Sequence, residues 1–189
     1  MLRRICGALA ARLVVRVDWR GEALDQLLDA DHARLVEMVV RELRAGGWHC
    51  LTEATFAIRG ERGSVDVLAY HEGTGILLVV EVKSVIADAQ ATLATFDRKI
   101  RLGPEIARER GWRVRSVAAV MVLAEGRTNR RRVEALRATF DTHLPARSAD
   151  MRTFLARPSG AIRGLWFLSG GPRADGRHRI GRPRAGSHG

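Results

Sequence analysis

Hydrophobic residues recur along the chain in patterns that predict helical sequence followed by three strands. Apolar positions at helical spacing mark a short helix around Leu24–Leu28 and a second helix from Asp31, its expected cap, to Leu43. Period-two alternation and continuous apolar runs, separated by turn-forming residues, then predict the strands. The strands cover 50–58, 64–70 and 76–84, and the turns cover 59–63 and 71–75. The last strand begins with five apolar residues, as expected where both faces of a strand are covered.

The second half of the chain continues with alternating helical and strand patterns. A helical pattern over 88–102 meets Gly103-Pro104, which we expect to interrupt it before a second helical stretch ends at Arg110. The remaining predictions are a strand at 116–124, a helix at 129–143, a short helix at 149–155 and a strand at 164–168. This order predicts an α/β fold, a three-layer sandwich with a central mixed β-sheet, rather than a doubly wound parallel sheet.

The length of 189 residues fits one domain of ordinary size with additional segments at its ends. We predict an N-terminal extension at 1–30, a folded domain at 31–170 and a basic, disordered tail at 171–189, where glycine, arginine and proline dominate.

Cysteine usage and hydropathy favour a cytoplasmic location. Cys6 and Cys50 are too few for a disulfide framework, which agrees with a reducing compartment. The short apolar start is interrupted by Arg12 and Arg16, so we do not expect export. No stretch approaches 18 uncharged apolar residues, so no membrane span and no membrane partner are expected.

The formal charge of +11 and the isoelectric point of about 11.3 favour a polyanionic partner, above all nucleic acid. The tail from Pro172 onward has five arginines against one aspartate, so most of the excess charge belongs to the rest of the chain. Lys83 and Lys99 are the only lysines among the 32 basic residues. An anionic membrane, or a mere compositional preference for arginine, would also account for the charge.

Three polar residues on two predicted strands form an Asp…Glu-x-Lys constellation. Asp66 lies among apolar residues on one strand, and Glu81 and Lys83 project from one face near the end of the next strand. A turn centred on Gly73 would place Asp66 across from residue 80 or 81, with Cβ atoms about 4.5–5.5 Å apart. Both carboxylates would then reach one ion.

This constellation suits metal-dependent cleavage of a phosphodiester. Two carboxylates and several waters are ligands that Mg²⁺ prefers, with Mn²⁺ as a substitute, and the backbone carbonyl of Val82 would add a further oxygen. Lys83 would stabilise the attacking hydroxide or bind the phosphate. The alternative is a cross-strand salt-bridge cluster on a solvated face. The apolar residues before Glu81 argue against it, because placing an acid at the end of a buried strand is costly.

With these motifs, the chain from about residue 33 to residue 124 resembles the PD-(D/E)XK, or restriction-endonuclease-like, nuclease superfamily. It looks most similar to the Holliday-junction-resolvase-like branch, which shares the Gly-x-x-Asp strand and the Glu-Val-Lys ending. The resemblance implies an αβββαβ core with Asp66, Glu81 and Lys83 as catalytic residues. It also implies a glutamate on the first helix near the metal, for which Glu37 is the candidate and Glu42 the fallback. Gln90, on the helix after the Glu-x-Lys strand, matches an assisting glutamine of parts of the superfamily.

Basic residues around this core are candidates for contacts with nucleic-acid phosphates. They are Arg59, Arg62, Arg98, Lys99 and Arg101. A solvated helix face explains several of them as well, and arginine would serve equally at Lys99.

Together these features predict a metal-dependent nuclease that hydrolyses DNA phosphodiester bonds. The alternative is a non-catalytic DNA-binding or regulatory module that keeps the nuclease fold. A homodimer is expected if two strands must be cut, although no segment identifies an interface.

Overall fold

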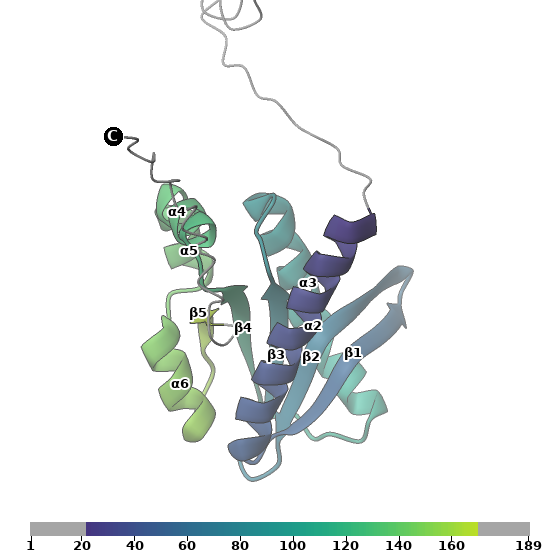
Figure 1. Cartoon of the computed structure of the whole chain (residues 1–189). Helices are drawn as coiled ribbons and strands as arrows, with labels where there is room; N and C mark the ends of the chain where they lie inside the picture. The colour runs from purple at the N-terminus through teal and green to yellow at the C-terminus, as the bar shows by residue number, and fades with distance from the viewer. Residues whose placement is uncertain (1–21, 170–189) are drawn as a thin grey trace, which may run out of the picture. The chain divides into compact units, whose positions relative to one another are not determined.

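Five strands form one open mixed sheet in the order β1-β2-β3-β4-β5 in the computed structural model, which describes residues 22–169 (Figure 1). The strands are β1 (His49–Ile58), β2 (Glu61–His71), β3 (Ile76–Lys83), β4 (Ser116–Ala124) and β5 (Arg163–Leu168). The first three pair antiparallel, whereas β4 is parallel to β3 and β5 is parallel to β4. Because β3 and β4 run in the same direction, the chain must cross over from the end of β3 to the start of β4, and a helix provides this crossover.

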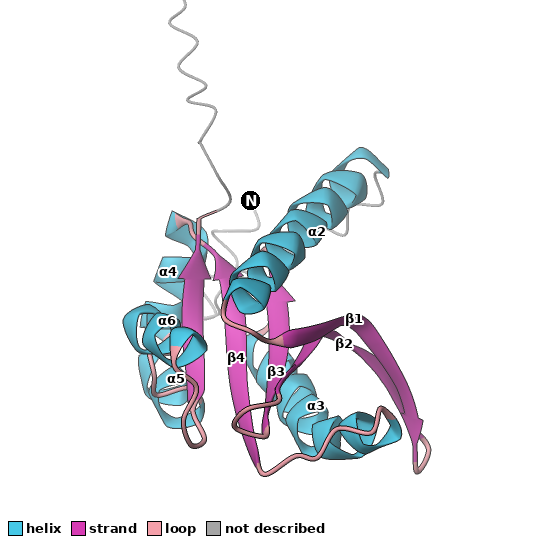
Figure 2. Cartoon of the chain, turned by 90° about the horizontal axis from the view of Figure 1, so that it is seen from below, coloured by secondary structure: helices cyan, strands magenta, loops and turns pink. Residues whose placement is uncertain are grey.

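Helices cover both faces of this sheet, as the sequence predicted (Figure 2). The chain divides into two compact units, Met1–Ala30 and Asp31–Gly189, and the whole sheet belongs to the second. The helices are α2 (Glu22–Ala45), α3 (Ala89–Glu109), α4 (Arg127–Ala135), α5 (Arg137–His143) and α6 (Ser148–Ala156). Buried residues of α3 and α5 pack on one face, and those of α6 and of α2 beyond Asp31 pack on the other. The predicted αβββαβ order and mixed sheet are confirmed.

Alternation along β3 assigns its side chains to the two faces. Leu77 and Val79 belong to the core beneath α3, whereas Leu78, Val80 and Val82 belong to the core beneath α2. Glu81 is in phase with Val79, so its carboxylate projects on the α3 face.

The helix α3 runs through Gly103-Pro104 without the predicted interruption. A Cβ at Gly103 would lie 2.9 Å from Val79 Cγ2 and 3.3 Å from Leu77 Cδ2, so glycine permits a close approach of helix and sheet. Packing of this apolar stripe outweighs the backbone hydrogen bond that Pro104 removes. Asp88 caps the helix, because its carboxylate accepts a hydrogen bond from the Ala91 N–H at 3.0 Å.

Other element boundaries also differ from the sequence-based prediction. The helix α2 continues through Asp31, which is therefore not a cap. Both Arg59 and Gly60 have positive φ, which is typical of a two-residue hairpin turn, so pairing resumes at Glu61 rather than at residue 64. The predicted helix at 129–143 divides at Leu136 into α4 and α5, and Phe140 of α5 becomes fully buried.

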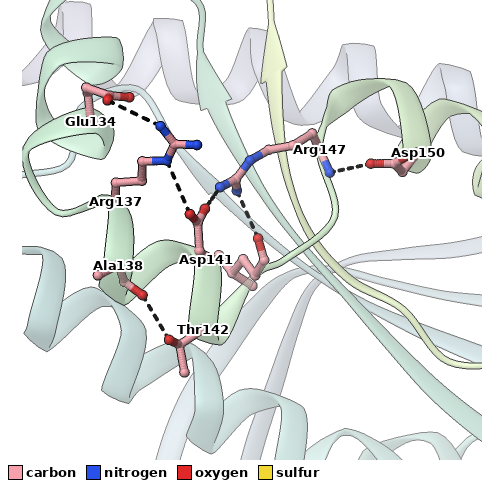
Figure 3. A network of polar contacts seen from close by, with 8 residues as sticks. Glu134, Arg137, Ala138, Asp141, Thr142, Arg147 and Asp150 are labelled. Atoms are coloured by element: carbon pink, nitrogen blue, oxygen red, sulfur yellow. Dashed lines mark hydrogen bonds and ion pairs between the residues drawn. The ribbon is translucent and has the colours of Figure 1, made fainter.

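A polar network ties α5 to the start of α6 (Figure 3). Asp141 pairs with both Arg137 and Arg147, and the Arg147 side chain also donates to the Leu144 carbonyl at 3.0 Å. The Asp150 carboxylate accepts from the Arg147 backbone N–H at 2.8 Å and so begins α6.

Two sequence-based predictions fall largely outside the described residues: the tail at 171–189 and most of the extension at 1–30. Between residues 22 and 169, no helix has both the length and the apolar character that crossing a membrane requires.

Candidate active site

Asp66 and Glu81 lie on adjacent antiparallel strands at the register that the sequence predicted. Val67 of β2 pairs with Val80 of β3, so continuing the register by one residue away from the hairpin turn places Asp66 opposite Glu81. The Asp66 Oδ2 atom accepts a hydrogen bond from the Val82 N–H at 2.6 Å. Val82 thus contacts the acid pair through its backbone donor, and this bond fixes one carboxylate oxygen of Asp66 while leaving the other to face the helix α3.

Glu81 lies between two lysines. Lys83 Nζ is 2.7 Å from Glu81 Oε1, and Lys99 Nζ, from α3, is 2.5 Å from Glu81 Oε2. The Glu81 side chain is 1% exposed, so both of its oxygens depend on these ammonium groups for compensation of their charge. Both lysines of the chain therefore contact the same carboxylate.

Lys99 also reaches the second acid. Its Nζ is 3.6 Å from Asp66 Oδ1, and its side chain is 9% exposed. The cluster thus contains two carboxylates and two ammonium groups and is formally neutral. Lys83, which is 34% exposed, is its most accessible member.

The structure places Lys99 in the interior and not on the exposed basic surface to which the sequence assigned it. Buried residues of α3 recur at helical spacing, and Lys99 lies in this stripe between Phe96 and Gly103. A lysine within an apolar stripe, in a chain that otherwise uses arginine, is the sequence signal that would have identified it.

Asn129, at the start of α4, organises the backbone just after Lys83, a role that the sequence did not reveal. Its amide nitrogen donates to Ser84 O at 2.8 Å and Ala124 O at 2.9 Å. Its Oδ1 accepts from the Ile86 N–H at 3.2 Å. Asn129 is buried, and these three bonds fasten the ends of β3 and β4 to the helix.

The structure does not bring the predicted helix residues to this cluster. Glu37 is exposed on α2, which covers the opposite face of the sheet from α3, and Glu42 is exposed on the same helix. Gln90 is exposed in the first turn of α3. It precedes Lys99 by nine residues, which is about 13 Å along a helix axis.

Glu53 occupies a distinct position on β1. The flanking pairs Thr52–Val67 and Ala54–Val65 place it opposite Asp66 in the register. Its φ of 48° is unusual for a glutamate, and its side chain is exposed. Within residues 22–169, no three or more acidic, histidine or cysteine side chains group closely enough to hold a metal, so Glu53 does not complete such a set.

The other predicted phosphate contacts lie along the β1–β2 hairpin and α3. Arg59 lies 3.6 Å from Glu105, and Arg101 binds both oxygens of Glu61 at 2.8 and 2.9 Å. Arg62 is exposed on β2, whereas Arg98 is half-buried and its Nε has no hydrogen-bond partner among the described residues. The carboxylates of Glu61 and Glu105 therefore compete with any phosphate for Arg101 and Arg59.

A comparison with models of known protein families finds no match to this chain, and a comparison with curated proteins finds none either.

Proposed function

We propose that the protein is a metal-dependent nuclease that hydrolyses DNA phosphodiester bonds, with Asp66, Glu81 and Lys83 at its catalytic centre. The observation that carries this proposal is the convergence of Asp66 Oδ1 and Glu81 Oε2 on one cationic group, with a second, more accessible ammonium on the other side of Glu81. The element order and these three residues also support the resemblance to the PD-(D/E)XK superfamily and its resolvase-like branch.

The donor set fits a hard divalent cation. Asp66 and Glu81 supply carboxylate oxygens, the ligands that Mg²⁺ and Mn²⁺ prefer, and no third acidic, histidine or cysteine ligand joins them among the described residues. Mg²⁺ is commonly held by one or two carboxylates, with water and substrate phosphate completing the shell. When bound, the metal would lower the pKa of a water ligand and offset charge on the phosphate.

Residues of the chain would orient the two carboxylates, donate hydrogen bonds to the substrate and bind the nucleic-acid backbone. Asp66 is oriented by the Val82 N–H, and Glu81 is oriented by the ammonium groups on both of its oxygens. Lys83 is exposed enough to donate a hydrogen bond to a phosphate oxygen or to the attacking water. Arg62 and the other surface arginines would supply contacts to the nucleic-acid backbone that do not depend on sequence.

A second candidate function follows from how fully the acids are engaged. Lysines contact both oxygens of Glu81, and Asp66 is held by Val82 and Lys99. This arrangement is also what an internal ion-pair network would show, and it favours a non-catalytic DNA-binding or regulatory module as the alternative. DNA as the partner, a cytoplasmic location and a homodimer belong to the proposal, and the net charge of +11 supports the first of them.

Cleavage assays with matched variants test the proposal. The full chain is incubated with linear and branched DNA and with Mg²⁺ or Mn²⁺, beside Asp66→Asn, Lys83→Met and Glu109→Gln, the last an exposed acid on α3. The first two variants should lose at least about a hundredfold in rate, the size typical of losing one electrostatic group, while Glu109→Gln retains activity.

Equal cleavage by the native protein and Asp66→Asn would contradict the proposal, as would failure to cleave any substrate. DNA binding that is the same with Mg²⁺ and with a chelator, and without cleavage, would favour the non-catalytic module.

A further inference from the structure

Lys99 is the group that touches both acids. Its Nζ lies 2.5 Å from Glu81 Oε2 and 3.6 Å from Asp66 Oδ1, whereas Lys83 pairs with Glu81 Oε1. The ammonium of Lys99 thus faces the same two oxygen atoms that would hold a divalent cation.

The position of Lys99 in the fold keeps the ammonium there. Its side chain leaves α3 from the buried stripe, with Phe96 one turn before it and Gly103 one turn after it. At Gly103 the helix lies so near the sheet that even a methyl group would contact Val79 within 3 Å. Lys99 itself is buried, so its side chain is enclosed by the protein along its way to the two carboxylates.

We propose that Lys99 is a tethered cation of the acid pair, and that a divalent metal binds Asp66 and Glu81 only by displacing its ammonium. This inference rests on the proposed function, because it concerns how that site takes up its metal. A divalent cation held by the carboxylates of Asp66 and Glu81 would lie beside the ammonium that already contacts both of them, and two cations so close together repel.

The affinity of the site for metal is therefore set by Lys99. Without another anion nearby, the ammonium favours the carboxylates and opposes metal binding. A substrate phosphate offers the displaced ammonium a second partner, since lysine carries a compact charge on a flexible stem. Metal and phosphate then bind more tightly together than either does alone. Lys99 thus acts as a positioning residue that couples metal uptake to the presence of substrate.

Binding of Mn²⁺ to the full chain, followed by electron paramagnetic resonance without nucleic acid, tests this inference directly. The variants are Lys99→Met, which removes the charge and keeps the length, and Arg110→Met, which removes one exposed positive charge after α3. Lys99→Met should bind Mn²⁺ at least about tenfold more tightly than the native protein, because a like charge has left the site. Arg110→Met should bind as the native protein does, and adding Asp66→Asn to Lys99→Met should abolish the gain.

Affinity of Lys99→Met equal to or weaker than that of the native protein would overturn the inference. Circular dichroism establishes whether each variant is folded, and Lys99→Gln replaces Lys99→Met if the latter unfolds. Refolding of Lys99→Met by Mn²⁺ would support the inference. Persistent unfolding with Mn²⁺, together with unchanged affinity of Lys99→Gln, would count against it.

The same titrations separate this inference from the proposed function. If the native protein binds Mn²⁺ through Asp66 and Lys99→Met binds no better, the inference fails and the proposed function stands. If only the Lys99 variants bind Mn²⁺, the inference stands, and the proposed metal dependence of the native protein is contradicted. If none binds, both fail.

Discussion

Lys99 of α3 and Glu81 of β3 form a buried ion pair across 18 residues of sequence, with Nζ 2.5 Å from Oε2. Lysine is rare in this chain, yet Lys83 holds the other oxygen of the same carboxylate. A compact ammonium suits this enclosed position, whereas the planar guanidinium used elsewhere in the chain would need several acceptors in its plane.

Removal of Lys99 should destabilise the protein strongly. Lys99→Met leaves Glu81 and Asp66 short of a counter-charge in a poorly solvated position, and loss of one partner of a buried pair costs about 3–5 kcal/mol. Urea denaturation measures the change in the free energy of unfolding. Combining Lys99→Met with Glu81→Gln should recover much of the loss, because the uncompensated charge is then gone. A double variant as unstable as the sum of its parts would contradict this interpretation.

Asn129 should matter for both stability and the site. Asn129→Ala leaves the Ser84 and Ala124 carbonyls and the Ile86 N–H without their partner, at a cost of about 1–3 kcal/mol for an unsatisfied buried group. Thermal denaturation measures this loss. Thr128→Ala, at the exposed neighbouring position, is the control and should be nearly neutral. Similar stability of the two variants would show that the three hydrogen bonds are dispensable.

Gly103→Ala should lower stability although alanine favours helices. The helix propensity gain is about 1 kcal/mol, whereas overpacking against Val79 and Leu77 costs about 1–3 kcal/mol. In a Val79→Ala background the contact is relieved, so Gly103→Ala should then cost less than it does in the native protein. Gly126→Ala is the matched control, since its added Cβ meets nothing within 4 Å. A stabilised Gly103→Ala variant would show that α3 can move away from the sheet.

Cys50 should react slowly with thiol reagents. Burial raises the pKa of its thiol from the ordinary 9.0 to about 11, a rise that nearby Arg44 partly offsets. In a Cys6→Ser background, the alkylation rate should rise with pH up to about 11 in the folded protein. After unfolding in urea, the rate should level off near pH 9.

The same shift in the Cys50 pKa predicts a pH-dependent stability. The folded protein holds the thiol proton more tightly than the unfolded chain, so this contribution is complete below pH 9 and is lost as the pH rises toward 11. Cys50→Ser should lack this loss. A plateau of native alkylation near pH 9 would contradict both expectations.

Much of the fold was predictable because its signals are local. Alternating and continuous apolar runs predicted every strand between residues 22 and 169, and the register of the β2–β3 hairpin followed from a turn centred on Gly73. Two of the boundaries that were wrong depend on tertiary contacts. Pro104 continues a helix because Gly103 packs on Val79, and Leu136 divides a helix so that Phe140 can enter the core.

Only the residues of the candidate site that lie on strands were predictable from the sequence. Strand geometry places Asp66, Glu81 and Lys83 together, since all three relationships lie within one hairpin. Lys99 and Asn129 reach the same region from helices, and their contacts depend on how those helices dock. Glu37, chosen through a family resemblance, lies on the helix that covers the other face.

The position of β3, antiparallel to β2 and parallel to β4, also bears on how the unit folds. Hairpins close in about 1–10 microseconds, so we expect Asp66 and Glu81 to meet before α3 completes the crossover to β4. The early hairpin then contains two opposed like charges that Lys99 has not yet neutralised. A pair of acids suited to holding a cation thus makes the hairpin dependent on the helix, and this dependence favours an all-or-none folding transition over a stable partial structure.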